Sequence, residues 1–111
     1  MSFQADRPVL TPAGLQSLLH AVSRGDREAG AALIQQYGPL VRQRFRRRLG
    51  PGLRRLMDST DLVSTVGRRL DAAISEGRVS FDSEPQLLGF LHALAVGAVA
   101  DKSRVLSRLR R

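Results

Sequence analysis

The sequence predicts an all-α fold, a compact bundle of four to five helices. Apolar residues recur at three- and four-residue spacing along most of the chain, which is the period of an amphipathic helix. Helix start and stop signals separate these stretches, and no alternating strand pattern runs for more than a few residues. A chain of 111 residues has the size of one domain with one modest core.

Charge is the main clue from composition. The net charge is +8, and 42% hydrophobic with 25% charged residues is close to the globular average. All 18 basic residues except Lys102 are arginine, a bias that a genome rich in G and C would also produce. The positive balance favours a polyanionic or acidic partner. The absence of cysteine excludes disulfide frameworks and thiolate metal sites.

The first ten residues lack a signal-peptide pattern, and no apolar run reaches the roughly 18 residues of a membrane span. We therefore expect a cytoplasmic protein without a membrane partner. Thr11 and Pro12 start a first helix, whose apolar face comprises Leu15, Leu18, Leu19 and Val22. Gly25 ends this helix. Residues 1–24 are thus predicted to be an N-terminal helix or arm, followed by the main helical domain, 25–111.

Asp26 is expected to cap the second helix, with Gly38 and Pro39 interrupting or bending it. Its inward side chains are Ala29, Leu33, Ile34 and Tyr37, and the continuation carries Leu40, Val41, Phe45 and Leu49. The sequence Gly-Pro-Gly at 50–52 predicts a break. The next helix begins at Asp58 or Ser59 and has an apolar stripe of Leu62, Val63, Val66, Leu70, Ala73 and Ile74. Ser83 and Gln86 resemble a capping box, which predicts a last helix from about Pro85.

Catalytic patterns are not found. His20 and His92 fall on different predicted helices, and neither has a carboxylate at the spacing of a metal site or proton relay. The sequence contains no Gly-rich phosphate loop and no nucleophile elbow. We expect no enzyme activity, no cofactor and no metal, and interpret both histidines as structural or surface residues.

Two polar features are candidates for binding. Residues 42–55 contain seven arginines in 14 positions, of which Arg42, Arg46 and Arg48 share a broad helical face. This segment is either a solvated face or an electrostatic surface for phosphates or an acidic helix. The second feature is a ridge of hydrogen-bonding side chains at three- and four-residue spacing: Asp61, Ser64, Thr65 and Arg68. The alternative for Asp61 is that it complements the helix dipole in a first turn.

Three stretches resemble the region-two domain of bacterial RNA polymerase sigma factors of the extracytoplasmic-function group. They are RGDREAGAALIQQYGPLVRQRFRRRLG, MDSTDLVSTVGRRLDAAI and VSFDSEPQLLGFLHALAVGAVADKSR, and the order, helix lengths and loops correspond from about Gly25 to the C-terminus. In that family a helix that begins Asp-Leu-Val-Gln-Glu docks on the clamp helices of the largest polymerase subunit. The loop after it captures an unstacked promoter base, and the last helix reads and helps to open the minus-ten element.

The resemblance implies core RNA polymerase and promoter DNA as partners, with an anti-sigma factor as a further candidate. Asp61, Leu62 and Val63 match the start of the docking motif, and the implied docking set is Asp61, Leu62, Ser64, Thr65 and Arg68. The implied DNA-binding set is Phe81, Phe90, His92, Lys102, Arg104 and Arg108. Phe81 matches the aromatic residue of the capture loop, and Phe90 stands at the usual tryptophan. Ala100 and Asp101 match the end of the pattern, before a basic tail that includes Arg104, Arg108, Arg110 and Arg111.

The departures from the family pattern are concentrated in two places. Ser64 and Thr65 replace the glutamine and glutamate of the docking motif, so two long side chains have become short. The last helix has Ala93, Val96 and Gly97 where the family usually has two arginines and an asparagine. The stretch from Leu87 to Ala100 is almost entirely apolar, which is typical of a buried helix or one that a partner covers.

Three functions follow. The first is a sigma-type module that docks on core RNA polymerase and contributes to recognition and melting of the minus-ten element. The second is a sigma-like protein-interaction module that self-associates through Leu87–Ala100 or binds a regulator without reading DNA. The third is a non-specific nucleic-acid binder that uses the arginines of residues 42–55.

Overall fold

A computed structural model describes residues 10–109 of the chain. These residues form five α-helices and one 3-10 turn: α2 (Pro12–Ser23), α3 (Arg27–Phe45), η1 (Arg46–Arg48), α4 (Pro51–Arg54), α5 (Ser59–Ser75) and α6 (Glu84–Leu109). No strand occurs between residues 10 and 109. The all-α bundle predicted from the sequence is therefore confirmed. The start of the predicted N-terminal arm, residues 1–9, and the tail residues Arg110 and Arg111 lie outside the described residues.

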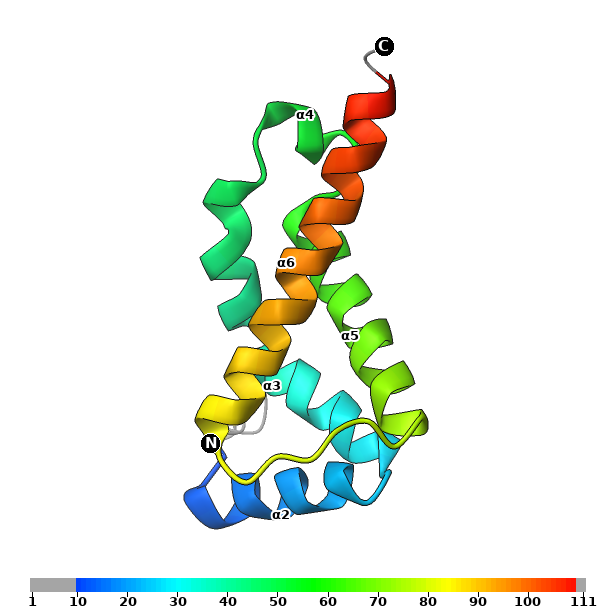
Figure 1. The fold of residues 1–111 in the computed structure, drawn as a ribbon. Helices are drawn as coiled ribbons and strands as arrows, with labels where there is room; N and C mark the ends of the chain where they lie inside the picture. The colour runs from blue at the N-terminus through cyan, green and yellow to red at the C-terminus, as the bar shows by residue number, and fades with distance from the viewer. Residues whose placement is uncertain (1–9, 110–111) are drawn as a thin grey trace.

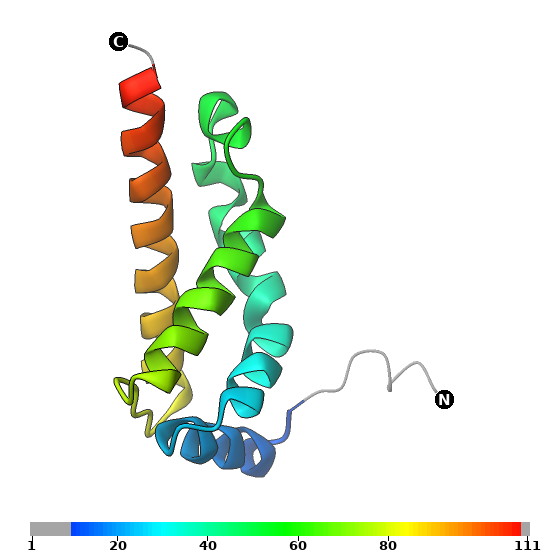
Figure 2. The ribbon, with the colours of Figure 1, turned by 90° about the vertical axis from the view of Figure 1, so that its right-hand side faces the viewer.

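Three long helices, α3, α5 and α6, make up the body of the molecule. Helix α2 crosses one end of this body, and α4 lies at the other end beside the C-terminal turns of α6 (Figures 1 and 2). The closest packing is between α3 and α5 and between α5 and α6, and α2 packs on α3. One end of the molecule is thus covered by α2, and the C-terminus of α3, the N-terminus of α5 and the C-terminus of α6 point toward the other end (Figures 1 and 2).

The predicted caps explain where the helices begin. Thr11 Oγ1 accepts a hydrogen bond from Gly14 N at 2.9 Å, and Asp26 Oδ1 accepts from Glu28 N at 3.0 Å. Gly25 separates the two helices with φ +94°, a left-handed conformation that favours glycine. Ser83 Oγ accepts from Gln86 N at 3.4 Å, while the Gln86 side chain accepts from Asp82 N, so this box is displaced by one residue. The last helix accordingly begins at Glu84, one residue before the position expected.

Helix α3 runs unbroken through Pro39, so of the two predicted alternatives at Gly38 and Pro39, an interruption or a bend, the interruption is wrong. A proline inside a helix removes one hydrogen bond, here the one that would end on the carbonyl of Gln35. Both Pro39 and Gln35 are exposed, so water can solvate that carbonyl. Buried residues on either side, among them Leu33 and Val41, hold both halves of α3 against the body.

One core runs through all the long helices, and its largest fully buried side chains come from α2, α3, α5, α6 and the turn after η1. They are Leu19, Val22, Leu33, Phe45, Leu49, Leu62, Val66, Leu70, Ile74, Leu87 and Leu91. Each large apolar side chain removed from water stabilises the fold by about 1.5–3 kcal/mol, and here the chain entropy opposes most of that gain. The α5 residues in this set are the ones that the apolar stripe predicts.

Two glycines allow α3 to approach α5 closely. A Cβ atom on Gly30 would lie 2.3 Å from Ile74 Cδ1, and one on Gly38 would lie 3.0 Å from Val63 Cγ1. At the far end of α3, the predicted break at residues 50–52 is present, but Pro51 also begins α4, a four-residue helix that the sequence did not predict. Within the described residues, no helix combines the length and apolar character that crossing a membrane requires.

Candidate functional site

The polar ridge on α5 is present on the surface. Asp61, Ser64 and Arg68 are exposed and Thr65 is half-buried. Arg68 Nη2 donates a hydrogen bond to Thr65 Oγ1 at 3.3 Å, so the two residues share one turn of the ridge. The ridge therefore offers one carboxylate, two hydroxyls and one guanidinium on a single helix face. We call these four residues the α5 ridge.

Asp61 also takes part in the cap of its own helix. Asp58 is the N-cap residue: its Oδ1 accepts from Asp61 N at 2.8 Å, and Asp61 Oδ2 accepts from Asp58 N at 3.2 Å. This reciprocal pair is a capping box, and losing such a cap costs about 0.5–2 kcal/mol. Asp61 thus has a structural role in addition to any docking role, and a test of docking needs a control for the cap.

Leu62 has no exposed surface and lies in the core. Its place in the docking set is corrected, because a side chain inside the bundle cannot contact a partner on the ridge. Together with the buried Val66, Leu62 supports the ridge from behind. The rigid packing beneath the ridge fixes the relative positions of the exposed side chains.

The loop between α5 and α6 carries Phe81, which is only 7% exposed. Its ring contacts Phe90 of α6 edge-on, with 5.5 Å between ring centroids. Its backbone N–H donates to Ser23 Oγ of α2 at 3.0 Å, and Gln16 of the same helix donates to the Asp82 carbonyl at 3.2 Å. Helix α2 therefore holds this loop closed, and Phe81 would have to leave the core to contact a nucleic-acid base.

The last helix has a buried side and an exposed side. Leu87, Leu91, Ala95 and Ala98 are buried, whereas Gly89, His92, Ala93 and Val96 are exposed, Val96 by 41%. Phe90 is half-buried. The apolar sequence of α6 thus reflects both a core face and an outer face of small side chains, and the outer face carries no charge between Glu84 and Asp101.

Gly97 has a packing role that links α5 to α6. A Cβ atom on Gly97 would lie 3.4 Å from Arg69 Nη1, and Arg69 Nη2 donates to Asp101 Oδ2 at 2.7 Å. Arg104, one turn beyond, also donates to Asp101. The hydrogen bond from Arg69 holds the pKa of the Asp101 carboxyl below its ordinary value, with burial opposing this and the charges of Arg104 and Arg69 adding to it.

The basic segment gathers at the end of the molecule that α4 occupies. All seven arginines of residues 42–55 are exposed, and none of them forms an ion pair within the described part of the chain. Arg42 lies on α3, whereas Arg46 and Arg48 fall in η1, so the predicted face is distributed over two elements. Phe45 and Leu49 are buried behind them, as the sequence predicts. The C-terminal turns of α6, which pack beside α4, carry the half-buried Lys102 and the exposed Arg108.

The two histidines lie far apart in the chain and in different settings. His20 is exposed on α2, and His92 is exposed on α6 with its ring 5.3 Å from that of Phe45. Among residues 10–109, no three His, Cys, Asp or Glu side chains come together to hold a metal ion.

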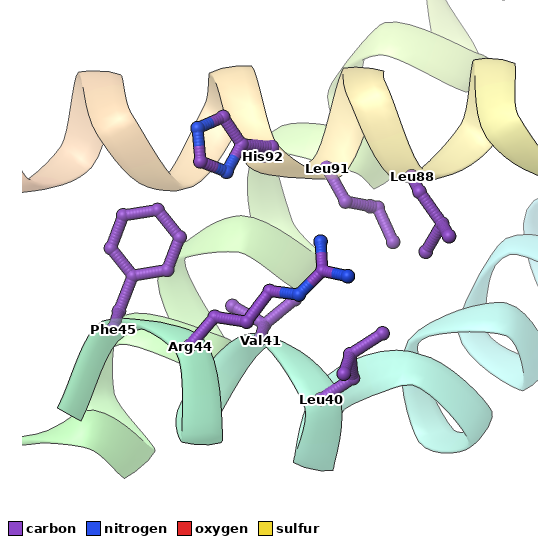
Figure 3. A pocket seen from close by; sticks show the side chains of 7 residues that line it. All are labelled: Leu40, Val41, Arg44, Phe45, Leu88, Leu91 and His92. Atoms are coloured by element: carbon purple, nitrogen blue, oxygen red, sulfur yellow. The ribbon is translucent and has the colours of Figure 1, made fainter.

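A groove between α3 and α6 was not identified from the sequence. It is lined by Leu40, Val41, Arg44, Phe45, Leu88, Leu91 and His92 (Figure 3). The sequence showed the apolar spacing along each of the two helices but not that α3 and α6 lie side by side, because their pairing is a tertiary contact. No family model, curated protein or solved structure matches this chain. The surfaces described above are therefore the basis for assigning a function.

Proposed function

We propose that the chain is a sigma-type transcription initiation module that acts in the cytoplasm and docks on the clamp helices of core RNA polymerase. The docking surface in this proposal is the α5 ridge. The sequence resemblance supplies the partner, and the exposed position of Asp61, Ser64 and Arg68 on one helix supports the proposal.

The ridge is the basis of this proposal because three of its four polar side chains are exposed, on a helix whose opposite side packs into the core. A protein partner gains most from side chains that are held in place before binding, since little conformational freedom is then lost. Arg68 and Thr65 already contact each other, and Asp61 is fixed by the cap. The short Ser64 and Thr65 side chains reduce the reach of the ridge, so the affinity should be lower than that of a ridge with two long polar residues.

Promoter contact is the second part of the proposal. The cations suited to phosphate contact are Lys102 and Arg108 at the end of α6, together with the neighbouring basic segment. Arg104 is paired with Asp101 and is less available. Recognition of a base by Phe81 requires release of the loop that Ser23 holds. An anti-sigma factor is the expected class of regulator.

The test is binding of the labelled full chain to bacterial core RNA polymerase. The variants are Asp61→Ala and, as a matched control, Asp58→Ala, since each removes one side of the capping box. Only the first also removes the ridge carboxylate. We expect Asp61→Ala to weaken binding about tenfold or more beyond Asp58→Ala, which corresponds to the loss of one interfacial charge contact.

Circular dichroism and urea unfolding establish that both variants remain folded. Equal binding by the two variants would remove Asp61 from the docking surface. Absence of any binding by the folded wild-type chain at micromolar polymerase would reject polymerase docking altogether.

A second candidate is a protein-interaction module that self-associates through Leu87–Ala100. It is favoured by the exposed small side chains of α6, among which Val96 is 41% exposed. Small residues let a second helix approach closely. Gel filtration of the wild type and Val96→Glu tests it: a dimer that the substitution dissociates supports this candidate, and a monomeric wild type rejects it.

A further inference from the structure

We propose that the groove between α3 and α6 binds an acidic protein segment that places one apolar side chain on the floor between the two helices. This inference goes beyond the proposed polymerase docking, because the groove residues and the α5 ridge are different sets. It rests on three features: the apolar floor, the cationic rim and the absence of acidic residues along both walls.

The floor of the groove is apolar. Val41, Phe45 and Leu91 are buried at its base, and Leu40 and Leu88 are half-buried on its two walls. Figure 3 shows Leu88 and Leu91 pointing from α6 toward α3, with Leu40 pointing back toward them. The depression between the helices is open to solvent and leaves enclosed room for only about one water molecule. It is therefore too small for a small-molecule ligand, and a partner segment would place the tip of one apolar side chain over this apolar floor.

The rim of the groove is cationic. The Arg44 side chain extends from α3 toward α6, and His92 faces Phe45 from the opposite wall (Figure 3). The guanidinium of Arg48 lies over the Phe45 ring, 5.0 Å from its centroid, at the same end of the groove. Neither Arg44 nor Arg48 forms an ion pair in the described residues. Two arginines beside an apolar floor match a carboxylate that lies next to an apolar side chain in a partner.

Acidic residues are missing from the walls. The sequence has none between Glu28 and Asp58, a stretch that includes all of the groove residues of α3, and none between Glu84 and Asp101 on α6. Glu84 lies one turn before Leu88, and its carboxylate accepts the hydrogen bond of Tyr37. At one end of the groove the carboxylate of Glu84 is already hydrogen-bonded to Tyr37, and at the other end the arginines have no ion pair within the described part of the chain. We therefore expect the acidic end of a bound segment to lie at the arginine end.

The charges around the groove favour an acidic protein segment over two other partners, a second copy of this chain and a nucleic-acid strand. A second copy of this chain would bring the same cationic rim and a net charge of +8 against the groove. A nucleic-acid strand could pair its phosphates with Arg44 and Arg48 but would leave the apolar floor unfilled. An acidic protein segment with an exposed leucine or similar side chain satisfies both features.

The experiment measures fluorescence anisotropy of three labelled probes with the full chain. The first probe is a helical peptide of glutamate, alanine and leucine with its leucines on one face, and the second replaces those leucines by serine at the same charge. The third is a thymidine oligonucleotide of matched length. We expect the leucine peptide to bind about tenfold or more tightly than the serine peptide, since filling the floor adds apolar burial to the same electrostatic attraction.

The variants are Arg44→Glu and, as a matched control, Arg24→Glu. Both arginines are exposed, so both proteins should fold, and each substitution changes the net charge equally. We expect Arg44→Glu to lower the affinity for the leucine peptide about tenfold or more and Arg24→Glu to have a much smaller effect on that affinity. Four results would overturn the proposal: no saturable binding, equal binding of the leucine and serine peptides, equal losses in the two variants, or tighter binding of the oligonucleotide that depends on Arg44.

Discussion

Arg69 of α5 reaches past Gly97 to form an ion pair with Asp101 of α6, with 2.7 Å between Arg69 Nη2 and Asp101 Oδ2. This contact joins α5, which the sequence resemblance predicts to dock on polymerase, to α6, which it predicts to contact DNA. A larger residue at position 97 would crowd the guanidinium, so the glycine and the ion pair form one packing unit.

The Asp101 ion pair predicts an acid-dependent loss of stability. Because the hydrogen bond from Arg69 lowers the pKa of Asp101 in the folded state, the carboxylate stabilises the fold above its unfolded pKa. This contribution is lost as the pH falls through the folded pKa. We expect the unfolding free energy of the wild type to fall more steeply than that of Asp101→Asn below about pH 4.

Urea unfolding of both proteins at a series of pH values measures this difference. Asp71 also has a lowered pKa, through the hydrogen bond from Arg27, but it is present in both proteins and cancels. Parallel pH curves would show that Asp101 contributes nothing to the pH dependence of stability.

The only tyrosine of the chain, Tyr37, should titrate late. Burial, followed by the hydrogen bond to Glu84 and the charge of that carboxylate, raises the pKa of Tyr37 to about 12. In the unfolded chain the phenol should titrate near its ordinary value of about 10. Because the folded pKa is the higher one, the neutral phenol stabilises the fold below about pH 10, and this contribution is lost as the pH rises toward 12.

Absorbance of the tyrosinate reports this titration directly, since the chain has one tyrosine and no tryptophan. Glu84→Gln should lower the pKa of Tyr37 toward, but not to, its ordinary value, because burial remains. An unchanged pKa in Glu84→Gln would mean that the carboxylate does not act on the phenol.

The glycines of α3 and α6 should respond in opposite ways to the same substitution. Gly89→Ala places a methyl group where no atom lies within 4 Å, so it should stabilise the protein by about 1 kcal/mol through helix propensity. Gly30→Ala places that methyl group 2.3 Å from Ile74 Cδ1 in the core. Overpacking of this kind costs typically about 1–3 kcal/mol, so this variant should be less stable. Urea midpoints of the two variants test this, and stabilisation by both would show that the Ile74 side chain can turn away from the added methyl group.

Local signals in the sequence predicted most of the helix boundaries. Thr11, Asp26 and Asp58 cap helices because their side chains bond to backbone groups within three residues, which a single sequence can reveal. Contacts between distant residues were not visible. The burial of Phe81 depends on α2 and α6, and the continuation of α3 through Pro39 depends on packing at both of its ends.

For the candidate site, too, the sequence predicted the features that depend on local spacing and missed those that depend on contacts between distant residues. Helical spacing placed Asp61, Ser64, Thr65 and Arg68 on one face and Leu62 in the apolar stripe, whereas the family resemblance placed Leu62 in the docking set. The partner of Arg69 and the groove between α3 and α6 join residues that are far apart in the sequence. Neither contact has a local sequence signal.

The short side chains of the α5 ridge can be lengthened to test docking by gain of function. Ser64 is exposed and Thr65 half-buried at the surface, so Ser64→Gln with Thr65→Glu should be accommodated, and the new carboxylate can contact Arg68 in place of the Thr65 hydroxyl. If the ridge docks on core RNA polymerase, the two long side chains restore two interfacial hydrogen bonds. At about 1–3 kcal/mol each, the affinity should rise roughly tenfold or more.

Binding of the labelled double variant and the wild type to core RNA polymerase measures the gain. Ala13→Glu with Ser17→Gln is the matched control, because it adds the same two side chains at exposed positions of another helix, α2. A gain in the ridge variant alone would assign the contact to Ser64 and Thr65. Equal affinity of the ridge variant and the wild type would count against docking through this face, because a contact surface must respond when its reach is extended.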